Sequence, residues 1–513
     1  MSRREGGRRG TRARREQAAA ESQTWHSLTN HFPRWEVLRP EELEAIHEAS
    51  MTLLEEQGLE VLAPEAVERY AAAGAIVDRE TGLVRLGRDL VMELVGKAPS
   101  EFTLTPRNAE HAQTFGGDHF NIGCTSGPPN CSDLEGGRRP GTYADACNLI
   151  KLFCALGVGH NLSASPVEAM DLPAETRHMD CYFANLTLSD RVFMARAIGA
   201  KRVEDALDMI AIARGMTRDA LVDDPSLMAV ISVNSPRRVD AEMIAGLTAL
   251  SENGQAVVVT PFTLMGAMTP VTLAGALMQQ NAEALAVIAY TQLLRPGAPV
   301  IYGGFTSNVD LRSGAPAFGT PEYSFAVIAG GQLARRYGLP YRSSNVNASN
   351  VVDAQSAYEA QNSLWSCMLG GVNLVHQGMG WLEGGLVTSY EQMVVDAELV
   401  RMFGHFLSHR PSFDAESLAL DAVREVGPGG HFFGVGHTIE RYETAFYQPL
   451  LSDWRNFESW QDAGAENATQ RASKIAKQLI ADYDPPALDP GRREALEAFM
   501  AKRKEESEAG LAA

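Results

Sequence analysis

The sequence predicts an α/β fold: a (β/α)8 barrel of the TIM type with a helical N-terminal region and a C-terminal helical extension. Beyond residue 144, short apolar runs rich in β-branched residues alternate with longer amphipathic segments, a pattern typical of parallel strands joined by helices. No Gly-x-Gly-x-x-Gly motif follows the first strand, which disfavours an open dinucleotide-binding sheet. With 513 residues, 45% of them hydrophobic, the chain can form one large domain with additional segments.

Seven strands are expected in this part of the chain, with an eighth near Val158 or in the irregular segment before it. The seven lie at 158–163, 192–195, 228–233, 256–261, 299–305, 340–345 and 372–376. In a barrel of this type, the loops after the strands build the active site. Candidate functional residues are therefore sought where these strands end.

Helices are expected before and between the strands. Apolar residues at helical spacing predict helices over 40–58, 64–73 and 88–95, whereas the Gly-, Asn- and Pro-rich stretch 116–141 predicts strands and long loops. Later helices have clear start and stop signals. They are a capping hydroxyl before proline at Thr269-Pro270 and Thr320-Pro321, a stop at Gly338, and a helix over 353–369 that ends at Gly370-Gly371.

These signals divide the chain into four segments. They are 1–37, a disordered arginine-rich tail and lead-in; 38–143, a helical and irregular region; 144–460, the barrel; and 461–513, C-terminal helices and a tail. Residues 1–16 hold seven arginines against Glu5 and Glu16, a balance of +5. Because the net charge of the whole chain is −19, the remainder carries −24. The acidic body is unsuited to nucleic acid, and the tail is either a solvated arm or a patch for an anionic partner.

Cysteine usage and hydropathy indicate the compartment. The six cysteines are too few for a disulfide scaffold in so long a chain, and none forms a Cys-x-x-Cys pair. No run approaches the roughly 18 apolar residues that a membrane-spanning helix needs. We therefore expect a cytoplasmic protein with reduced thiols and no membrane partner.

Aromatic rings dominate the expected strand ends, with a few amides and carboxylates. A quaternary ammonium group has no N–H, so a protein holds it by ring faces and diffuse charge attraction. The residues placed to do so are Phe262, Tyr302, Phe305, Trp381 and Glu383. The alternative is that Phe262, Tyr302 and Phe305 simply fill the core.

Metal-ligand patterns are weak, and we assign no metal site. His405 and His409 are four residues apart but lack the intervening glutamate of zinc proteases. The spacings of Cys124 and Cys131, and of Cys147 and Cys154, match no zinc pattern, and buried cysteine is common.

Four segments carry a resemblance to a known family. IHEASMTLLEEQGLEV at 46–61, PVIYGGFTSNVDLRSGAPAFGTPE at 299–322, GQLARRYGLPYRSSNVNASN at 331–350 and GWLEGGL at 380–386 resemble the trimethylamine methyltransferase family. The resemblance runs from about Leu38 to Ala472. It implies a (β/α)8 barrel that moves a methyl group from a methylated amine to the cobalt of a corrinoid (cobalamin) carried by a separate corrinoid protein.

The same resemblance narrows the substrate. The family's founding members carry pyrrolysine and act on trimethylamine, but this chain contains only the twenty standard residues. The branch without pyrrolysine resembles demethylases of quaternary amines such as glycine betaine. A quaternary nitrogen already carries its charge and leaves as a neutral amine. Because cob(I)alamin is the nucleophile in the family's reaction, we assign no catalytic residue; the protein aligns the substrate, excludes water and holds the cation.

A betaine substrate also needs hydrogen-bond donors for its carboxylate. The candidates are Arg312, Asn345, Asn347 and His376. Arg312 alternatively braces its loop, and His376 is alternatively a core histidine. The segment 431–460 resembles the family's closing segment, with Val435 and Tyr447 as departures that bear on substrate choice.

Two other functions stay open at this point. One is a zinc-dependent corrinoid methyltransferase acting on another methyl donor, and the other is a barrel that binds a methylated amine without catalysis. A large acidic barrel is also compatible with a homo-oligomer.

Overall fold

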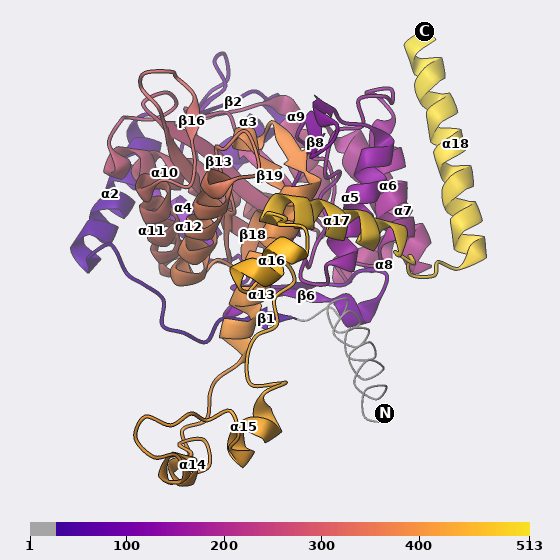
Figure 1. Ribbon diagram of the computed structural model, residues 1–513. Helices are drawn as coiled ribbons and strands as arrows, with labels where there is room; N and C mark the ends of the chain where they lie inside the picture. The colour runs from indigo at the N-terminus through magenta and orange to yellow at the C-terminus, as the bar shows by residue number, and fades with distance from the viewer. Residues whose placement is uncertain (1–26, 513) are drawn as a thin grey trace.

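The computed structural model describes residues 27–512, with side chains described for 27–507 (Figure 1). The arginine-rich tail expected at the N-terminus lies outside the described residues, apart from the lead-in that follows it. Within the described part, no helix is long and apolar enough to cross a bilayer.

A sheet of parallel strands forms the centre of the molecule. Its order is β7 (His119–Cys124), β18 (Leu374–Met379), β17 (Tyr341–Ser344), β14 (Val300–Gly303), β13 (Ala256–Met265), β11 (Leu227–Val233) and β10 (Phe193–Met194). Each neighbouring pair in this order is parallel. The predicted strands from 192 to 376 are therefore confirmed in position, and β7 comes from the region predicted as irregular.

The sheet is curled. Asn161 bridges in parallel to Gly123 of β7, and the adjacent Leu162 bridges in parallel to Phe193 of β10. Because one short segment reaches strands at both ends of the order, those ends must approach each other. The segment predicted as a strand at 158–163 thus makes bridges only, without forming a ladder of its own. β1 (Leu28–Thr29) pairs antiparallel with β7, on the edge of β7 opposite β18.

Helices follow the strands and cover the sheet. They are α5 (Tyr143–Ala155), α6 (Arg177–Leu188), α7 (Ala200–Arg214), α8 (Arg218–Asp223), α9 (Ala241–Glu252), α10 (Leu273–Leu294), α11 (Pro321–Arg336), α12 (Ala354–Gly370) and α13 (Tyr390–Ser408). The Thr320 hydroxyl accepts from the Tyr323 N–H at the start of α11, as its sequence predicts. Gly371 ends α12 at a φ of 76°, a conformation that favours glycine.

One helix start differs from its prediction. Thr269 and Pro270 do not cap α10, which begins at Leu273 with Thr272 as its N-cap. Instead, the Thr269 N–H and carbonyl bond to Leu264 and Gly266, closing a turn after β13. The turn uses the backbone groups that a helix start would need.

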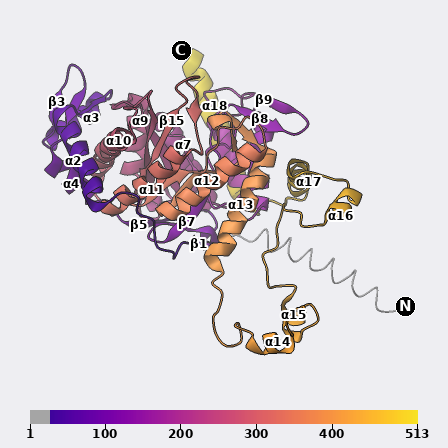
Figure 2. The ribbon, with the colours of Figure 1, turned by 60° about the vertical axis from the view of Figure 1, so that its left-hand side comes forward.

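Hairpins and shorter strands complete the described part. Beside the strands already named they are β2 (Leu59–Val61), β3 (Ile76–Asp78), β4 (Leu83–Arg85), β5 (Glu101–Leu104), β6 (Gln113–Gly116), β8 (Asn130–Asp133), β9 (Gly137–Pro140), β12 (Arg238–Val239), β15 (Phe305–Val309), β16 (Pro316–Ala317), β19 (Trp381–Leu382) and β20 (Val387–Ser389). The C-terminal part adds α14 (Leu420–Glu425), α15 (Gly436–Arg441), α16 (Phe457–Asp462), α17 (Ala468–Ala481) and α18 (Pro490–Ala512). α14 and α15 stand clear of the body in two views (Figures 1 and 2).

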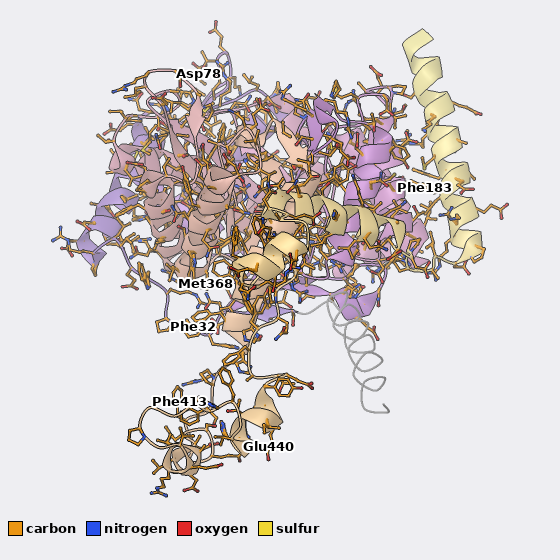
Figure 3. All side chains as sticks on the ribbon, viewed as in Figure 1. Phe32, Asp78, Phe183, Met368, Phe413 and Glu440 are labelled. Carbon is orange, nitrogen blue, oxygen red and sulfur yellow. The ribbon has the colours of Figure 1, made fainter. Side chains whose placement is uncertain are left out.

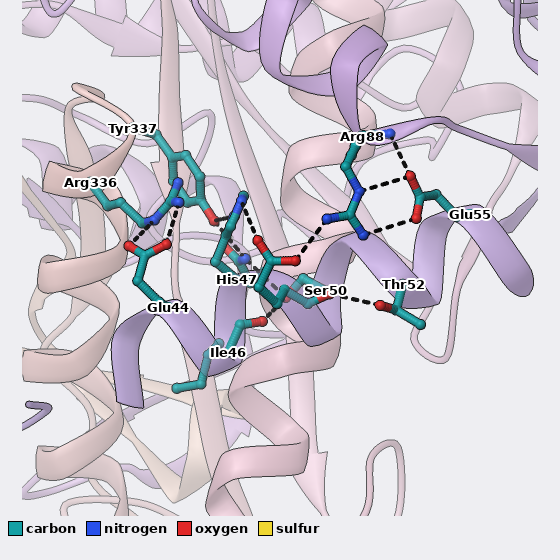
Figure 4. A network of polar contacts seen from close by, with 11 residues as sticks. Glu44, Ile46, His47, Ser50, Thr52, Glu55, Arg88, Arg336 and Tyr337 are labelled. Carbon is teal, nitrogen blue, oxygen red and sulfur yellow. Dashed lines mark hydrogen bonds and ion pairs between the residues drawn. The ribbon is translucent and has the colours of Figure 1, made fainter. Parts of the chain in front are cut away.

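The N-terminal helices α2 (Pro40–Glu56), α3 (Pro64–Ala72) and α4 (Arg88–Val95) pack on α10 at one end of the molecule (Figure 2). A buried polar network joins α2 to the helix layer (Figure 4). The Asn281 amide donates to Ser50 Oγ at 3.0 Å and to the Tyr337 hydroxyl at 2.9 Å, while the Tyr302 hydroxyl donates to Asn281 Oδ1 at 3.0 Å. Tyr337 also contacts His47 Nδ1 at 2.9 Å. Asn281 therefore links α2, α11 and β14 through one side chain.

Replacing Asn281 should destabilise the whole fold. Asn281→Ala leaves buried hydroxyls of Ser50, Tyr302 and Tyr337 short of a partner, and we expect the free energy of unfolding to fall by roughly 2–4 kcal/mol. Denaturant unfolding measures this change. Arg69→Ala, which breaks a half-exposed ion pair with Glu252, is the comparison and should cost less than about 1 kcal/mol. Equal losses in the two variants would contradict the network's role.

Candidate functional site

The two faces of the central sheet differ in character. Tyr302 and Tyr341 point to the helix layer, where their hydroxyls donate to Asn281 and to the Val327 carbonyl. The opposite, inner face carries a separate apolar cluster that includes Met228, Val258, Ile301 and Leu374, closed off by Leu104 and Phe115 of the β5–β6 hairpin. Since side chains alternate along a strand, the register identifies which residues follow this cluster on the inner face.

The inner face turns polar toward the carboxyl ends of the strands. Arg342 pairs in register with Leu374 of the apolar cluster, so the two share a face. Two residues further along the strands, Ser344 pairs with His376 and Ser232 with Thr260. Several of these polar atoms are buried without a hydrogen-bond partner among the described residues: Arg342 Nε and Nη1, Thr260 Oγ1, Ser344 Oγ and His376 Nδ1. Unpaired buried polar groups are costly and rare, which marks this end of the sheet as a functional site.

Arg342 is the centre of this polar layer. Its side chain is 2% exposed, and its guanidinium carbon lies 5.0 Å from the centroid of the Phe305 ring. Burial lowers the pKa of Arg342 to about 10, so it remains charged at neutral pH. No carboxylate pairs with it within the described residues. A buried cation without a counter-ion is strongly unfavourable, so the arrangement suits an anionic ligand group.

Aromatic rings gather next to Arg342. Phe305 lies 4.9 Å from Phe262 and 5.7 Å from Phe318 between ring centroids. Trp381 meets Phe305 and Phe318 edge-on at 6.4 and 6.3 Å. These four residues, called the aromatic cluster below, come from β13, β15, the loop before α11 and β19. Three of them were predicted from the sequence as cation-binding residues.

Two predicted amides hold the backbone around the cluster. Asn347 donates to the Trp381 carbonyl at 2.7 Å, and the Trp381 indole donates back to the Asn347 carbonyl at 3.2 Å. Asn345 donates to the Gly378 carbonyl at 3.0 Å and to Asp396 at 3.2 Å. In both amides, Oδ1 is buried and unpaired. They therefore present acceptors, and not the donors expected from the sequence.

Asp396 of α13 holds Asn345 and the Gly380 backbone in place by hydrogen bonds. Its carboxylate accepts from Asn345, from Gln392 at 2.9 Å and from the Gly380 N–H at 2.8 Å. Complete burial raises its pKa to about 7, and these hydrogen bonds oppose the rise. The pKa of the neighbouring His376 is lowered well below its usual value. Burial is the larger cause, and the positive charge of Arg342 is the second. His376 is therefore neutral at pH 7.

The remaining predicted residues lie elsewhere. Tyr302 is fully buried on the helix side, as the core-filling alternative anticipated. Arg312 is exposed in the loop between β15 and β16, where its N–H donates to Asp310. Glu383 forms an ion pair at 2.7 Å with Arg138 of β9, and its side chain is 24% exposed. The structure does not bring these three side chains into the group formed by Arg342 and the aromatic cluster.

Sequence reasoning missed Arg342, Phe318 and Asp396. Arg342 had a visible signal, because a charged residue stands inside a predicted buried strand at 340–345. Phe318 lies in a loop, and Asp396 lies within a helix, 16 residues after the Gly380 backbone that it holds, so local pattern gave no sign of either. Over residues 27–512, no three His, Cys, Asp or Glu side chains gather as a metal site would require.

A family model and the sequence relatives agree on one family. The family model for trimethylamine methyltransferase (MTTB) matches residues 4–508. A glycine betaine methyltransferase of Desulfitobacterium hafniense (strain Y51) is 37% identical over 476 residues, 93% of this chain and 98% of that protein. The trimethylamine methyltransferase MttB of D. hafniense (strain DSM 10664 / DCB-2) is 30% identical, covering 91% and 93%. The crystal structure of the hydroxylamine MtmB complex covers 87% of this chain and 93% of that chain at a TM-score of 0.47 and 10% identity.

The raised pKa of Asp396 predicts a measurable pH dependence of stability. An unfolded aspartate titrates near pH 4, so between about pH 4 and 7 the folded state holds a proton that the unfolded state releases. This contribution to stability is present at low pH and is lost as pH rises through the window. Thermal unfolding should therefore show Asp396→Asn gaining on the wild type from about pH 5 to 7. His376 is common to both proteins and cancels, so parallel pH profiles would rule out this titration.

Proposed function

Because this chain belongs to the trimethylamine methyltransferase family, we propose that it transfers a methyl group from a carboxylate-bearing quaternary amine to the cob(I)alamin of a separate corrinoid protein. Its activity as a methyl-transferring enzyme follows from the family, and a glycine betaine-like substrate is the proposal. One observation carries it: a buried, charged Arg342 with unpaired N–H groups lies directly beside the aromatic cluster. The higher identity to a glycine betaine methyltransferase than to the trimethylamine enzymes supports the same choice.

Arg342 selects for a negative group on the substrate. A carboxylate accepts from one of the unpaired N–H groups of Arg342 and supplies the counter-charge that the protein lacks at this position. A cation without a carboxylate, such as choline, instead places a second positive charge beside a buried guanidinium. At such short range and in a weakly polar site, this repulsion amounts to several kcal/mol. His376, being neutral, offers an additional hydrogen-bonding nitrogen without adding charge.

The aromatic cluster suits the other end of a betaine. A quaternary ammonium group gains about 0.5–2 kcal/mol from each ring face it meets. The unpaired Oδ1 atoms of Asn345 and Asn347 favour the positively polarised methyl groups in the same region. A zwitterion thus matches the site at both ends. Glu383, which the sequence placed at the cation, is already neutralised by Arg138.

The proposed methyl transfer requires the protein mainly to position the substrate. In the transfer, the C–N bond breaks, the nitrogen keeps the electron pair and leaves as a neutral tertiary amine. Cob(I)alamin supplies the nucleophilic electron pair that forms the new bond to the methyl group. Since no proton moves, a site without a general acid fits the reaction, and neutral His376 is compatible with it. The protein's task is to fix the methyl group in line and to exclude water.

The proposed architecture is a complete (β/α)8 barrel, in which residues 158–163 close the sheet between β7 and β10. The site then lies at the carboxyl ends of the strands, where a separate corrinoid protein can approach. We place the reaction in the cytoplasm, where free thiols such as the six cysteines of this chain persist.

Replacing Arg342 tests the proposal directly. Arg342→Gln keeps a hydrogen-bonding side chain but removes the charge, and kcat/KM for glycine betaine should fall on the order of 100- to 1,000-fold. The assay follows methylcobalamin absorbance with reduced cobalamin as acceptor. Arg312→Ala, which alters the exposed arginine of the β15–β16 loop, should retain activity within about 2-fold. A larger loss in Arg312→Ala than in Arg342→Gln would overturn the assignment.

A substrate panel tests the charge requirement. Glycine betaine, proline betaine and carnitine carry both a quaternary nitrogen and a carboxylate, whereas choline and trimethylamine lack the carboxylate. We expect efficient transfer from members of the first group, and transfer from choline at least about 100-fold slower because choline leaves Arg342 unpaired. Comparable rates from choline or trimethylamine would sink the proposal. Calorimetric binding of a betaine without any transfer would favour a binding protein over an enzyme of this specificity.

A further inference from the structure

The segment 409–456, called the arm below, leaves the body where α13 ends and returns near residue 447. On its return, Leu450 and Leu451 donate backbone N–H groups to Glu398 of α13 at 2.7 and 2.8 Å, and the Tyr447 hydroxyl donates to the same carboxylate. Between these points α14 and α15 project away from the body in both views (Figures 1 and 2). The arm is therefore firmly attached at its base and extended beyond it.

The arm is rich in exposed apolar side chains. Phe413, Leu418, Phe433 and Phe446 are each between 65% and 85% exposed. Scattered single residues of this kind are ordinary on a protein surface, but a concentration within one projecting segment marks an interaction site. The arm has no sheet or long helix of its own against which to bury them.

A second apolar surface lies on the body beside the base of the arm. It is formed by Phe32, Trp365, Met402 and Phe406, all between 36% and 46% exposed, and is called the patch below. Phe32 stacks on Phe406 at 4.9 Å, and Trp365 meets Phe406 edge-on at 5.9 Å. Phe406 is two residues from the end of α13, yet the arm leads away from the patch. Figure 3 shows Phe32 at the lower edge of the body and Phe413 well away from it in the arm.

Charge agrees with contact between the two surfaces. A groove of about 450 Å³ adjoins the patch through Phe32 and contains Arg34 and Arg335. Arg34 pairs with Asp118, whereas Arg335 donates to the Gly370 carbonyl and forms no ion pair among the described residues. The arm carries seven carboxylates against four arginines. An acidic, apolar arm thus matches an apolar patch with a cationic border.

We propose that the occupant of the patch is the arm of a second copy of this chain, exchanged reciprocally in a two-fold dimer. One chain supplies both surfaces in equal number, so a single symmetry axis covers both arms and both patches and leaves no open end. Aromatic side chains bury on the order of 150 Å² each, so two exchanged arms bury on the order of 1,000 Å², which reaches the lower limit for a biological interface. The inference is independent of the proposed substrate.

The first test is the mass of the full-length protein in solution, measured by light scattering after size exclusion at micromolar concentration. We expect the mass of two chains of 55.6 kDa each. The double variant Phe433→Ser/Phe446→Ser in the arm, and separately Phe406→Ser in the patch, should raise the dimer dissociation constant at least about tenfold. Ile76→Ser, a 62% exposed residue of β3, is the matched control and should leave it unchanged. Circular dichroism checks that each variant is folded.

Mixing the variants distinguishes exchange from an arm that folds onto its own body. In a mixture, the intact arm of Phe406→Ser meets the intact patch of the arm variant, so one of the two contacts is restored and dimers form more readily than from either variant alone. A mixture that dimerises no better than its components overturns the exchange. A monomeric wild-type protein also overturns the exchange. If, in addition, the arm variants lose binding to a corrinoid protein, the arm binds that partner and not a second copy of the chain.

Discussion

A buried positive charge without a counter-ion governs the arrangement of the site. On the inner face of the sheet, Arg342 lies at the boundary between the apolar cluster and the polar layer at the carboxyl ends of the strands, and the described residues supply no carboxylate to neutralise it. The Phe305 ring face lowers the cost of burial only in part, because a cation–π contact is worth far less than the hydration that the guanidinium gives up. The fold must therefore offset this cost elsewhere, and the missing charge is left for a ligand.

The surrounding structure is organised to hold that charge in place. The β5–β6 hairpin closes the apolar cluster from below, so Arg342 cannot relax toward water on that side. On the helix side, the network around Asn281 ties β14, which pairs with β17, to α10 and α2. On the far side, Asp396 ties Asn345 and the Gly380 backbone to α13. Rigid supports of this kind are what allow a polar site to remain unpaired until a ligand arrives.

The sequence predicted the architecture better than the site. Periodicity and capping placed the strands from 192 to 376 and the helices α2, α3, α4, α11 and α12, because these signals depend on near neighbours in the chain. Phe262, Phe305 and Trp381 were found because they follow strands. Arg312 was named as a carboxylate donor and Arg342 was missed, because only strand register reveals that Arg342 shares the inner face with Leu374. Asp396 and Phe318 reach the site through tertiary packing, which no local pattern encodes.

Under the proposed betaine specificity, the unpaired arginine would let this enzyme separate substrates that share a methylated nitrogen. Aromatic rings bind any quaternary ammonium group, so they discriminate weakly between choline and a betaine. Rejection is stronger than attraction when the wrong ligand leaves a buried polar group unsatisfied, as happens at Arg342 with a ligand that has no carboxylate. On this proposal, substrate choice rests on a residue that contacts the carboxylate end of the substrate, away from the reacting methyl group. The same proposal implies that a change of substrate class would alter that charge and keep the rings that hold the cation.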